Sequence, residues 1–245
     1  MPSPAAEAGG SGPPHRPQPV GPSRWILPEP NPGDAEVVGV GADLEPATLV
    51  DAYARGIFPW PQAGSRLPWC SPDPRAVIEP GRVHASRTLR RHLRRCGWTS
   101  TVDLAFAEVV AGCSRRREGT WITRPMRRAY TRLADLGWAH SVEVWDGEEL
   151  VGGIYGVAIG GCFTGESMFH RAPEASKVAL VDLCHRWFAA SGAVVDVQLP
   201  TPHLQAMGAV TVSRVEFLRR LAAVRHHEVA LDRARWAVSR LAAVG

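Results

Sequence analysis

The sequence offers little of what marks secreted, metal-binding or disulfide-rich proteins. It has five cysteines, an odd number, and no two of them stand at a CxxC spacing. A disulfide framework and a zinc ribbon are therefore excluded, and we expect buried reduced thiols. The nine histidines form neither an HxxxH nor an HExxH pattern, so no metal site is assigned.

Long hydrophobic runs are also absent. The longest weakly polar stretch, Leu150 to Phe163, has about 14 residues including five glycines, too short and too rich in glycine to cross a bilayer. The first 24 residues contain no apolar segment of the kind found in signal peptides. We therefore expect a cytoplasmic protein without membrane spans.

Lysine is almost missing: of 28 basic residues, 27 are arginine and one is Lys177. The net charge is +4. So strong a bias is typical of a GC-rich genome and does not by itself predict an RNA-binding protein. Lys177 stands either where a guanidinium does not fit or where chance placed it.

What is present is enough apolar sequence for a sizeable core. The chain has 245 residues, 45% of them hydrophobic, which predicts one large domain or two small ones. Residues 1–24 differ, with seven prolines and four glycines, and are predicted to be a disordered tail. Order is expected to begin near Trp25.

Hydrophobic periodicity and turn residues predict an α/β or α+β fold with a mixed sheet. Asp103, Ser176 and Ser213 are expected to cap helices, as is Ser86, and a C-terminal helix is expected after about Arg225. The expected helices are 46–55, 86–96, 103–113, 125–136, 176–190, 203–207 and one from 213, and the expected strands are 37–40, 140–145, 149–159, 162–169, 194–199 and 209–212.

The segment from Gly56 to Arg75 is unusual. Five prolines between positions 59 and 74 exclude regular structure, yet the segment carries three large aromatic side chains. Two interpretations stay open: a loop that packs onto the body of the protein, or a rigid aromatic wall of a binding site.

Three polar side chains lie within two otherwise apolar strands. Strand alternation places Glu166 and Met168 on one face and Ser167 and Phe169 on the other, so Glu166 is either solvent-exposed or functional. Asp196 and Gln198 share one face near the carboxyl end of a buried strand. Buried polar side chains are costly unless they have partners, and this end of a strand is where α/β folds place their sites, so we favour a functional pair.

A stripe of arginines follows one face of a predicted helix. Arg87, Arg90, Arg91 and Arg94 stand at i, i+3, i+4 and i+7, and six arginines lie between positions 82 and 95 without an acidic residue. The stripe is either a plain solvated face or a surface that binds an anionic partner, for which phosphate is the obvious candidate.

These motifs together closely resemble the leucyl/phenylalanyl-tRNA–protein transferase family. The resemblance runs in uninterrupted order from about Trp25 to Leu221 and does not include the N-terminal tail or the residues after about Arg225. It rests on seven segments: Asp43–Trp60, Trp69–Arg75, Glu118–Thr123, His140–Trp145, Val151–Gly156, Gly165–Phe169 and Ser176–Lys177.

The resemblance implies a transferase that moves Leu or Phe from aminoacyl-tRNA to the N-terminal Arg or Lys of a protein and so marks it for N-degron proteolysis. It implies a small N-terminal domain at 25–72 and a catalytic domain of the GCN5-related acetyltransferase fold at 73–245. The implied partners are Leu-tRNA, Phe-tRNA and the acceptor protein, with no membrane. The ester is already activated, so no cofactor is implied, and we expect a monomer. Asp196, Gln198 and Glu166 match the family's catalytic positions, with Gln198 accepting from the incoming ammonium and Asp196 orienting it.

The same resemblance assigns an apolar amino-acid pocket and an aromatic site for the terminal adenosine. Trp187 is larger than the usual residue at its position and is expected to bias the pocket toward Leu. The pocket positions are Ile154, Phe163, Met168, Leu180, Leu183, Trp187 and Val195; the aromatic positions are Tyr53, Trp60, Trp121 and Tyr130.

Two other functions remain as alternatives. An acyl-CoA-dependent N-acyltransferase would need a [QR]-x-x-G-x-[GA] loop, and the nearest match, Gln205 to Val210, fails at its last position. A non-enzymatic RNA-binding protein would explain the arginines but leaves Glu166, Asp196 and Gln198 without a role.

Overall fold

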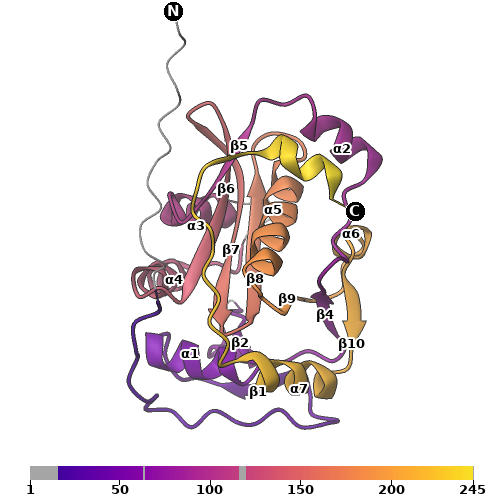
Figure 1. Cartoon of the computed structure of the whole chain (residues 1–245). Coiled ribbons are helices and arrows are strands. Elements are labelled where there is room, and N and C mark those ends of the chain that lie inside the picture. Colours follow the sequence, from indigo (N-terminus) through magenta and orange to yellow (C-terminus); the bar gives the residue numbers. More distant parts are fainter. Residues whose placement is uncertain (1–15, 63, 116–119, 245) are drawn as a thin grey trace, which may run out of the picture.

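An eight-stranded mixed sheet organises the part of the chain that the computed structural model describes, residues 16–62, 64–115 and 120–244 (Figure 1). Neighbouring strands are antiparallel except β8 and β9, which run parallel. The predicted mixed α/β class is confirmed. In spatial order the strands are β10 (Val210–Val212), β4 (Arg75–Ile78), β9 (Val194–Gln198), β8 (Cys162–His170), β7 (Glu149–Ile159), β6 (Ala139–Asp146), β5 (Thr99–Val102) and β11 (Trp236–Ala237).

Helices cover both faces of the sheet. The 15-residue α5 (Ala175–Ala189) lies on one face, and its apolar side chains form a core cluster with β6, β7, β8 and β9. On the other face α1 (Pro46–Ala54), α3 (Phe106–Ser114) and α4 (Arg124–Asp135) form a second cluster. The sheet therefore buries both faces, which accounts for strands as apolar as β7.

The N-terminal part forms a small antiparallel sheet of its own, in the order β1 (Val37–Val40), β3 (Pro68–Cys70) and β2 (Phe58–Pro59). The expectation that prolines exclude regular structure here is wrong. Pro59 ends β2 and Pro68 begins β3, and proline is tolerated at strand ends where its missing N–H costs no ladder hydrogen bond. This sheet and α1 share the second core cluster with the large sheet.

Residues 16–24 also depart from the expected disorder. Gln18 receives a hydrogen bond from the Trp138 indole at 2.8 Å and donates one to the carbonyl of Leu136 at 2.8 Å. Arg16 pairs with Glu228 at 2.9 Å. The segment thus lies along the protein, and the remainder of the predicted tail, residues 1–15, falls outside the described residues.

Helix caps follow the sequence in some places and not in others. Ser86 and Ser213 accept hydrogen bonds from backbone amides of α2 (Arg87–Leu93) and α7 (Arg214–Val224), as predicted. Asp103 caps nothing: its carboxylate accepts from the backbone of Ser141 and lies 2.8 Å from His140. Ser176 lies inside α5, whose N-cap position is taken by Glu174.

The C-terminal helix that we expected after Arg225 does not form. The chain extends across the molecule, pairs as β11 and ends in a 3-10 helix, η1 (Val238–Ala243). Val238 and Leu241 are fully buried and belong to the cluster that contains α2 and α5. A spacing of three between buried residues suits a 3-10 helix, whose turn is three residues.

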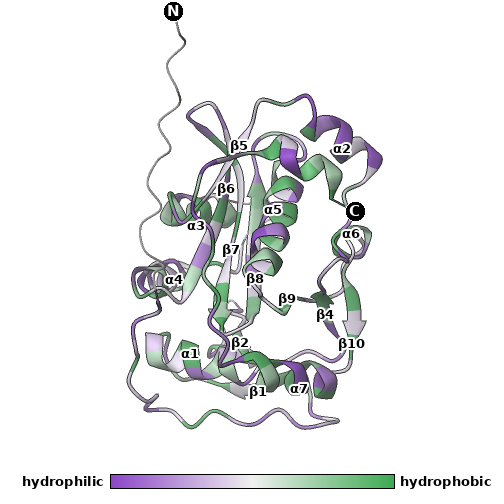
Figure 2. Ribbon diagram, in the orientation of Figure 1, coloured by the Kyte–Doolittle hydropathy of each residue, from purple (hydrophilic) through white to green (hydrophobic). Residues whose placement is uncertain are grey.

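Between β9 and β10 lies α6 (Pro202–Ala206), close to the expected 203–207. Figure 2 shows hydrophilic residues along much of α2, in keeping with its four arginine and histidine positions after Ser86.

Candidate active site

A cleft opens in the sheet where the parallel pair β8 and β9 separates. Their pairing ends at Thr164 and Asp196, although β8 continues to His170 and β9 to Gln198. A cavity of about 270 Å³ occupies the gap and is lined from both strands, by Glu166 and Met168 on one side and Val197 and Gln198 on the other. Backbone groups and side chains of two diverging strands thus face one space, the arrangement that α/β folds use for ligand sites.

A β-bulge aims Glu166 at this cleft. Tyr155 pairs with Ser167 and the next residue, Gly156, pairs with Gly165, so Glu166 is the extra residue of β8. The predicted alternation is wrong here because a bulge resets it: Glu166 contacts Tyr130, whereas Met168 packs in the α5 cluster. A side chain at Gly156 would collide with the carbonyl of Thr164, so glycine is required opposite the bulge.

Asp196 is held by Arg75, a residue that we did not predict. The guanidinium donates two hydrogen bonds to the carboxylate, Nε at 2.8 Å from Oδ1 and Nη2 at 2.6 Å from Oδ2, and both side chains are at most 1% exposed. The rings of Phe58 and Phe217 lie 4.9 and 4.5 Å from the guanidinium carbon. Arg75 stood in a motif that we noted, but nothing in the sequence paired it with a residue 121 positions away.

Gln198 connects the two carboxylates. Its backbone amide donates to Asp196 Oδ1 at 2.9 Å, and its side-chain Nε2 donates to Glu166 Oε1 at 2.9 Å. Its φ of 66° turns the chain out of β9 at this residue. The predicted juxtaposition of Asp196 and Gln198 holds, but Asp196 fixes the backbone of Gln198, while Glu166 orients the amide.

Behind Glu166 lies a relay of hydroxyl groups. Tyr130 donates to Glu166 Oε2 at 2.8 Å, and the Tyr53 and Tyr130 oxygens are 2.6 Å apart. Burial raises the pKa of Glu166 to about 7 against the lowering effect of these hydrogen bonds. Burial and the nearby Glu166 also raise the pKa of both tyrosines, which keeps them protonated as donors.

This burial does not fit the expected stacking role of Tyr53 and Tyr130. The two residues are 2% and 0% exposed, so neither ring offers a face to an adenosine. Trp60 and Trp121 are only half-buried, stack on each other at 6.0 Å between ring centroids, and line the cleft. The segment that contains Trp60 therefore packs onto the body of the protein as part of the small sheet and also contributes an aromatic side chain to the lining of the cleft.

The seven expected pocket residues divide into two layers. Ile154, Met168 and Leu180 line the cavity. The other four are buried in the core cluster behind it: Phe163, Leu183, Trp187 and Val195. Trp187 donates to the carbonyl of Val194 at 3.1 Å and meets Phe163 edge-on at 5.4 Å between ring centroids, and none of these three residues lines the cavity.

Several lining residues were missed by sequence reasoning. They follow β9, where two prolines marked only an irregular connection: Leu199, Thr201, His203 and Leu204. The signal that could have found them was their place beyond the carboxyl end of the strand that carries Asp196 and Gln198.

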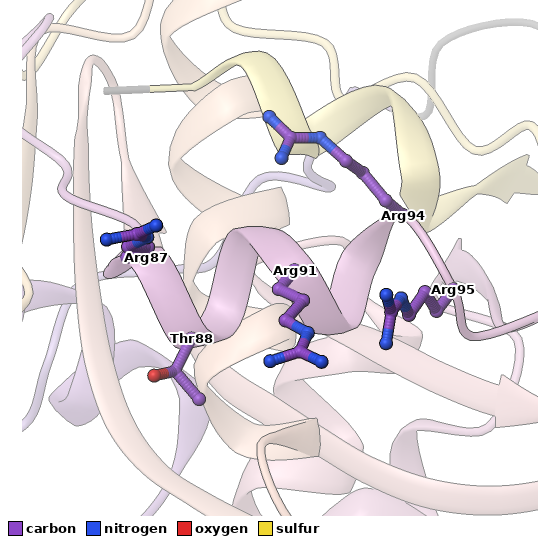
Figure 3. Close-up of a pocket in the computed structure, with 5 residues that line it drawn as sticks. All are labelled: Arg87, Thr88, Arg91, Arg94 and Arg95. Carbon is purple, nitrogen blue, oxygen red and sulfur yellow. The ribbon is translucent and has the colours of Figure 1, made fainter.

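The arginines of α2 lie apart from this cleft. Arg87, Thr88, Arg91, Arg94 and Arg95 line a hollow of about 530 Å³. Figure 3 shows these side chains on α2 and on the two residues that follow it. Leu89 and Leu93 face the core, as predicted. Arg90 also belongs to the predicted stripe, but it is half-buried and does not line the hollow. Arg95, which was not part of the stripe, does line it.

Other chemistries find little support in the described part of the chain. All five cysteines are free, and burial raises the pKa of Cys162 and Cys184, which disfavours their thiolate forms. No three His, Cys, Asp or Glu side chains in residues 16–62, 64–115 and 120–244 are arranged to hold a metal ion. Within the same ranges no helix is long and apolar enough to cross a membrane.

The fold and the site together define a mixed α/β protein with an apolar side-chain pocket beside a buried carboxylate–amide network. The chain belongs to the leucyl/phenylalanyl-tRNA protein transferase family. The model of that family matches residues 77–222, and the model of its N-terminal domain matches residues 42–73.

Individual proteins agree with this assignment. The chain is 44% identical over 203 residues to the leucyl/phenylalanyl-tRNA–protein transferase of Shewanella baltica OS195, covering 82% of this chain and 85% of that protein. It is 48% identical over 204 residues to that of Stutzerimonas stutzeri A1501, covering 82% and 88%. Among solved structures, a GCN5-related N-acetyltransferase from Kribbella flavida aligns over 66% of this chain and 58% of its own, with a TM-score of 0.39 and 11% identity.

Proposed function

We propose that this protein transfers Leu or Phe from aminoacyl-tRNA to the α-amine of a protein that begins with Arg or Lys, and so marks that protein for N-degron proteolysis. The observation that carries the proposal is the Arg75–Asp196–Gln198–Glu166 network at the mouth of an apolar cavity. Because aminoacyl-tRNA is a cytoplasmic substrate, the activity belongs in the cytoplasm, and the site is complete within one chain, as a monomer requires.

The cavity suits one aliphatic or aromatic side chain. Its volume of about 270 Å³ is below the usual range of roughly 300–1,000 Å³ for pockets that bind drug-sized ligands or cofactors. Ile154, Met168 and Leu180 supply its apolar lining, and Trp60 and Trp121 are the half-buried rings on which a terminal adenosine can stack.

The reaction is attack of an amine on an ester, which needs no side-chain nucleophile. The amine nitrogen bonds to the ester carbon, the ester C–O bond breaks, and the ribose oxygen leaves with a proton. The side-chain Nε2 of Gln198 donates to Glu166. The amide oxygen of Gln198, Oε1, therefore remains available to accept a hydrogen bond from the incoming ammonium. An amide is too weak a base to keep a proton, so the ammonium loses its first proton to water. The second proton, released as the C–N bond forms, passes to the leaving ribose oxygen directly or through water.

Asp196 and Glu166 support this step rather than perform it. Asp196 holds the backbone of Gln198, and Arg75 holds Asp196. Glu166 fixes the rotation of the Gln198 amide. The rate gain comes from holding the two bound substrates in the reacting orientation. Such positioning can lower the activation free energy by on the order of 7–11 kcal/mol.

The test is transfer of labelled Leu from Leu-tRNA, and separately of Phe from Phe-tRNA, to a peptide with N-terminal Arg. The same peptide with an acetylated amine and one with N-terminal Ala are the controls. We expect label on the Arg peptide only. Absence of transfer by the folded protein, or equal labelling of the acetylated peptide, would reject the proposed function.

A further inference from the structure

A large groove lies next to the proposed active site. Its volume is about 1090 Å³, and it extends from the end of β8 and the start of α5 to Arg115 after α3. Met168 and His203 line both this groove and the apolar cavity. The groove therefore opens directly beside the cleft, whereas the hollow at α2 shares no lining residue with it.

The groove is basic. Among the described residues, the basic side chains that line it are Arg115, His170, Arg171, Lys177 and His203, and the one acidic side chain is Glu174. Lys177 Nζ lies 2.8 Å from Glu174 Oε1, so this carboxylate is already paired with a cation. Burial and the charge of Lys177 lower the pKa of His203, which favours its neutral form, so the fixed positive charges of the groove are Arg115, Arg171 and Lys177.

Local structure holds these side chains in the groove. Arg171 donates to the carbonyl of Leu150 at 2.8 Å and lies 5.6 Å from the ring of Phe169. Ser176, 8% exposed, lies 3.4 Å from His170 and fixes that ring beside the start of α5. The positive end of the α5 dipole adds to the same field.

A basic groove beside the cleft discriminates between the two proposed substrates. An acceptor with N-terminal Arg or Lys is cationic there, and like charges at an interface are unfavourable. The donor is different: when its terminal nucleotide and amino acid occupy the cleft, the preceding phosphates must leave through an adjoining space. A single strand carries one negative charge per nucleotide, which the groove complements.

We infer that this groove binds the phosphodiester backbone of the unpaired 3′ end of the donor tRNA, with Arg171 and Lys177 as phosphate contacts. This inference rests on the proposed function and adds a second RNA-binding surface to it. The arginines at α2 then contact a part of the tRNA farther from the amino acid. An acidic segment of the acceptor protein is the competing occupant.

Donors of three lengths test the inference: aminoacyl-adenosine without phosphate, the aminoacylated 3′-terminal trinucleotide, and whole aminoacyl-tRNA. The variants are Lys177→Ala, Lys177→Arg and Arg171→Ala. Arg219→Ala, on α7 with a side chain 68% exposed, is the control for loss of one surface cation. Arg91→Ala is the control for the hollow at α2.

We expect Lys177→Ala and Arg171→Ala each to raise KM about tenfold for the trinucleotide and the tRNA, the scale of one charged hydrogen bond, with kcat unchanged. The slope of log KM against log salt should fall by about 0.7 per lost contact. Lys177→Arg should keep KM close to that of the wild type, and Arg219→Ala should leave KM unchanged. Arg91→Ala should raise KM for the tRNA but not for the trinucleotide.

Four results separate the explanations. Unchanged KM of both groove variants on the trinucleotide overturns the inference. An equal loss with aminoacyl-adenosine also overturns it, because the groove would then only support the fold. The groove variants could instead raise KM for an acidic acceptor peptide while KM for the donor stays unchanged. That result would show that the groove binds the acceptor protein, and it would also overturn the inference. Failure of wild type with every donor rejects the proposed function itself.

Discussion

At the scale of single residues, the site depends on buried charge that is fully paired. Asp196 is 0% exposed and Arg75 1%, and the buried carboxylate is tolerated because Arg75 pairs with it in a bidentate contact while the Gln198 amide and the Thr164 hydroxyl also donate to it. Removal of either Asp196 or Arg75 therefore leaves the other charge buried and uncompensated.

Asp196→Ala should therefore destabilise the protein by about 3–5 kcal/mol, measured by urea unfolding. Gln198→Ala removes a side chain 7% exposed that has no charge, so the fold should persist while transfer falls about a hundredfold. Wild-type turnover by folded Gln198→Ala would remove Gln198 from the mechanism. Unchanged stability of Asp196→Ala would show that Arg75 finds another partner.

The buried carboxyls predict a dependence of stability on pH. Burial raises the pKa of Glu166 and of Glu143 from 4.5 to about 7. Between those values the folded state keeps protons that the unfolded chain has released, so stability should fall as the pH rises from about 4.5 to about 7, then level off. The dependence of the urea midpoint on pH across this range should become weaker in Glu143→Gln and in Glu166→Gln.

The exposed Glu149→Gln is the matched control for that experiment. It should leave the pH dependence of the urea midpoint as in the wild type. A midpoint that stays constant, or rises with pH in this window, would contradict the raised pKa values.

Trp187 is predicted to favour Leu over Phe. It is 1% exposed and packs against Phe163 in the core cluster that also contains Ile154 and Leu180, which line the cavity. A smaller ring at position 187 should therefore let the lining of the cavity relax. A mismatch of about one methylene changes discrimination by roughly 10–200-fold. In a competition of Leu-tRNA with Phe-tRNA, Trp187→Phe should raise Phe transfer more than Leu transfer; an unchanged ratio would mean that Ile154 and Leu183 already provide the space.

At the scale of elements, α2 shows how one short helix serves two purposes. Its apolar side, Leu89 and Leu93, is fully buried, and Ser86 caps its start. Its exposed side carries Arg87 and Arg91, and Arg94 and Arg95 directly follow its last residue (Figure 3). The helix is held by the core and presents its charges to solvent.

Simultaneous replacement of Arg87, Arg91, Arg94 and Arg95 by Ala should weaken tRNA binding and reduce its salt dependence. Each lost phosphate contact should lower the log–log slope by about 0.7–0.9. The loss should be equal for leucyl and phenylalanyl tRNAs, because phosphate contacts carry no sequence information. Filter binding at several salt concentrations measures it, and an unchanged slope would leave the hollow as a solvated face.

At the scale of the whole molecule, the C-terminal segment ties distant elements together. Arg186 donates to the carbonyl of Asp232 at 2.5 Å, and Arg240 pairs with the buried Asp182 of α5. Leu241 of η1 is 0% exposed within the cluster that includes α2. The segment beyond the family's matched range is thus part of the core.

Leu241→Ala should cost about 2–5 kcal/mol of stability, as for other buried leucines. Leu104→Ala, at a position 60% exposed, is the control and should change stability by about 0.5 kcal/mol or less. Urea unfolding of both variants decides the matter. Equal effects would mean that the C-terminal segment contributes nothing to the core.

The sequence by itself determined the elements whose causes are local. Alternation and the Asp146–Gly147 turn predicted β6 and β7, apolar periodicity predicted α5, and serine caps predicted the starts of α2 and α7. The motifs also identified Glu166, Asp196 and Gln198, which the structure brings together.

Only the tertiary structure decided what depends on contacts distant in sequence. The bulge at Glu166 follows from how β7 and β8 pair, and the partner of Asp196 comes from a strand 121 positions earlier. Tyr53 and Tyr130 are hydrogen-bonded behind Glu166 because α1 and α4 pack together over the sheet. The C-terminal segment pairs as β11 and ends in η1, in place of the expected helix, because burial of Val238 and Leu241 against α2 and α5 outweighs its weak local preference for α-helix.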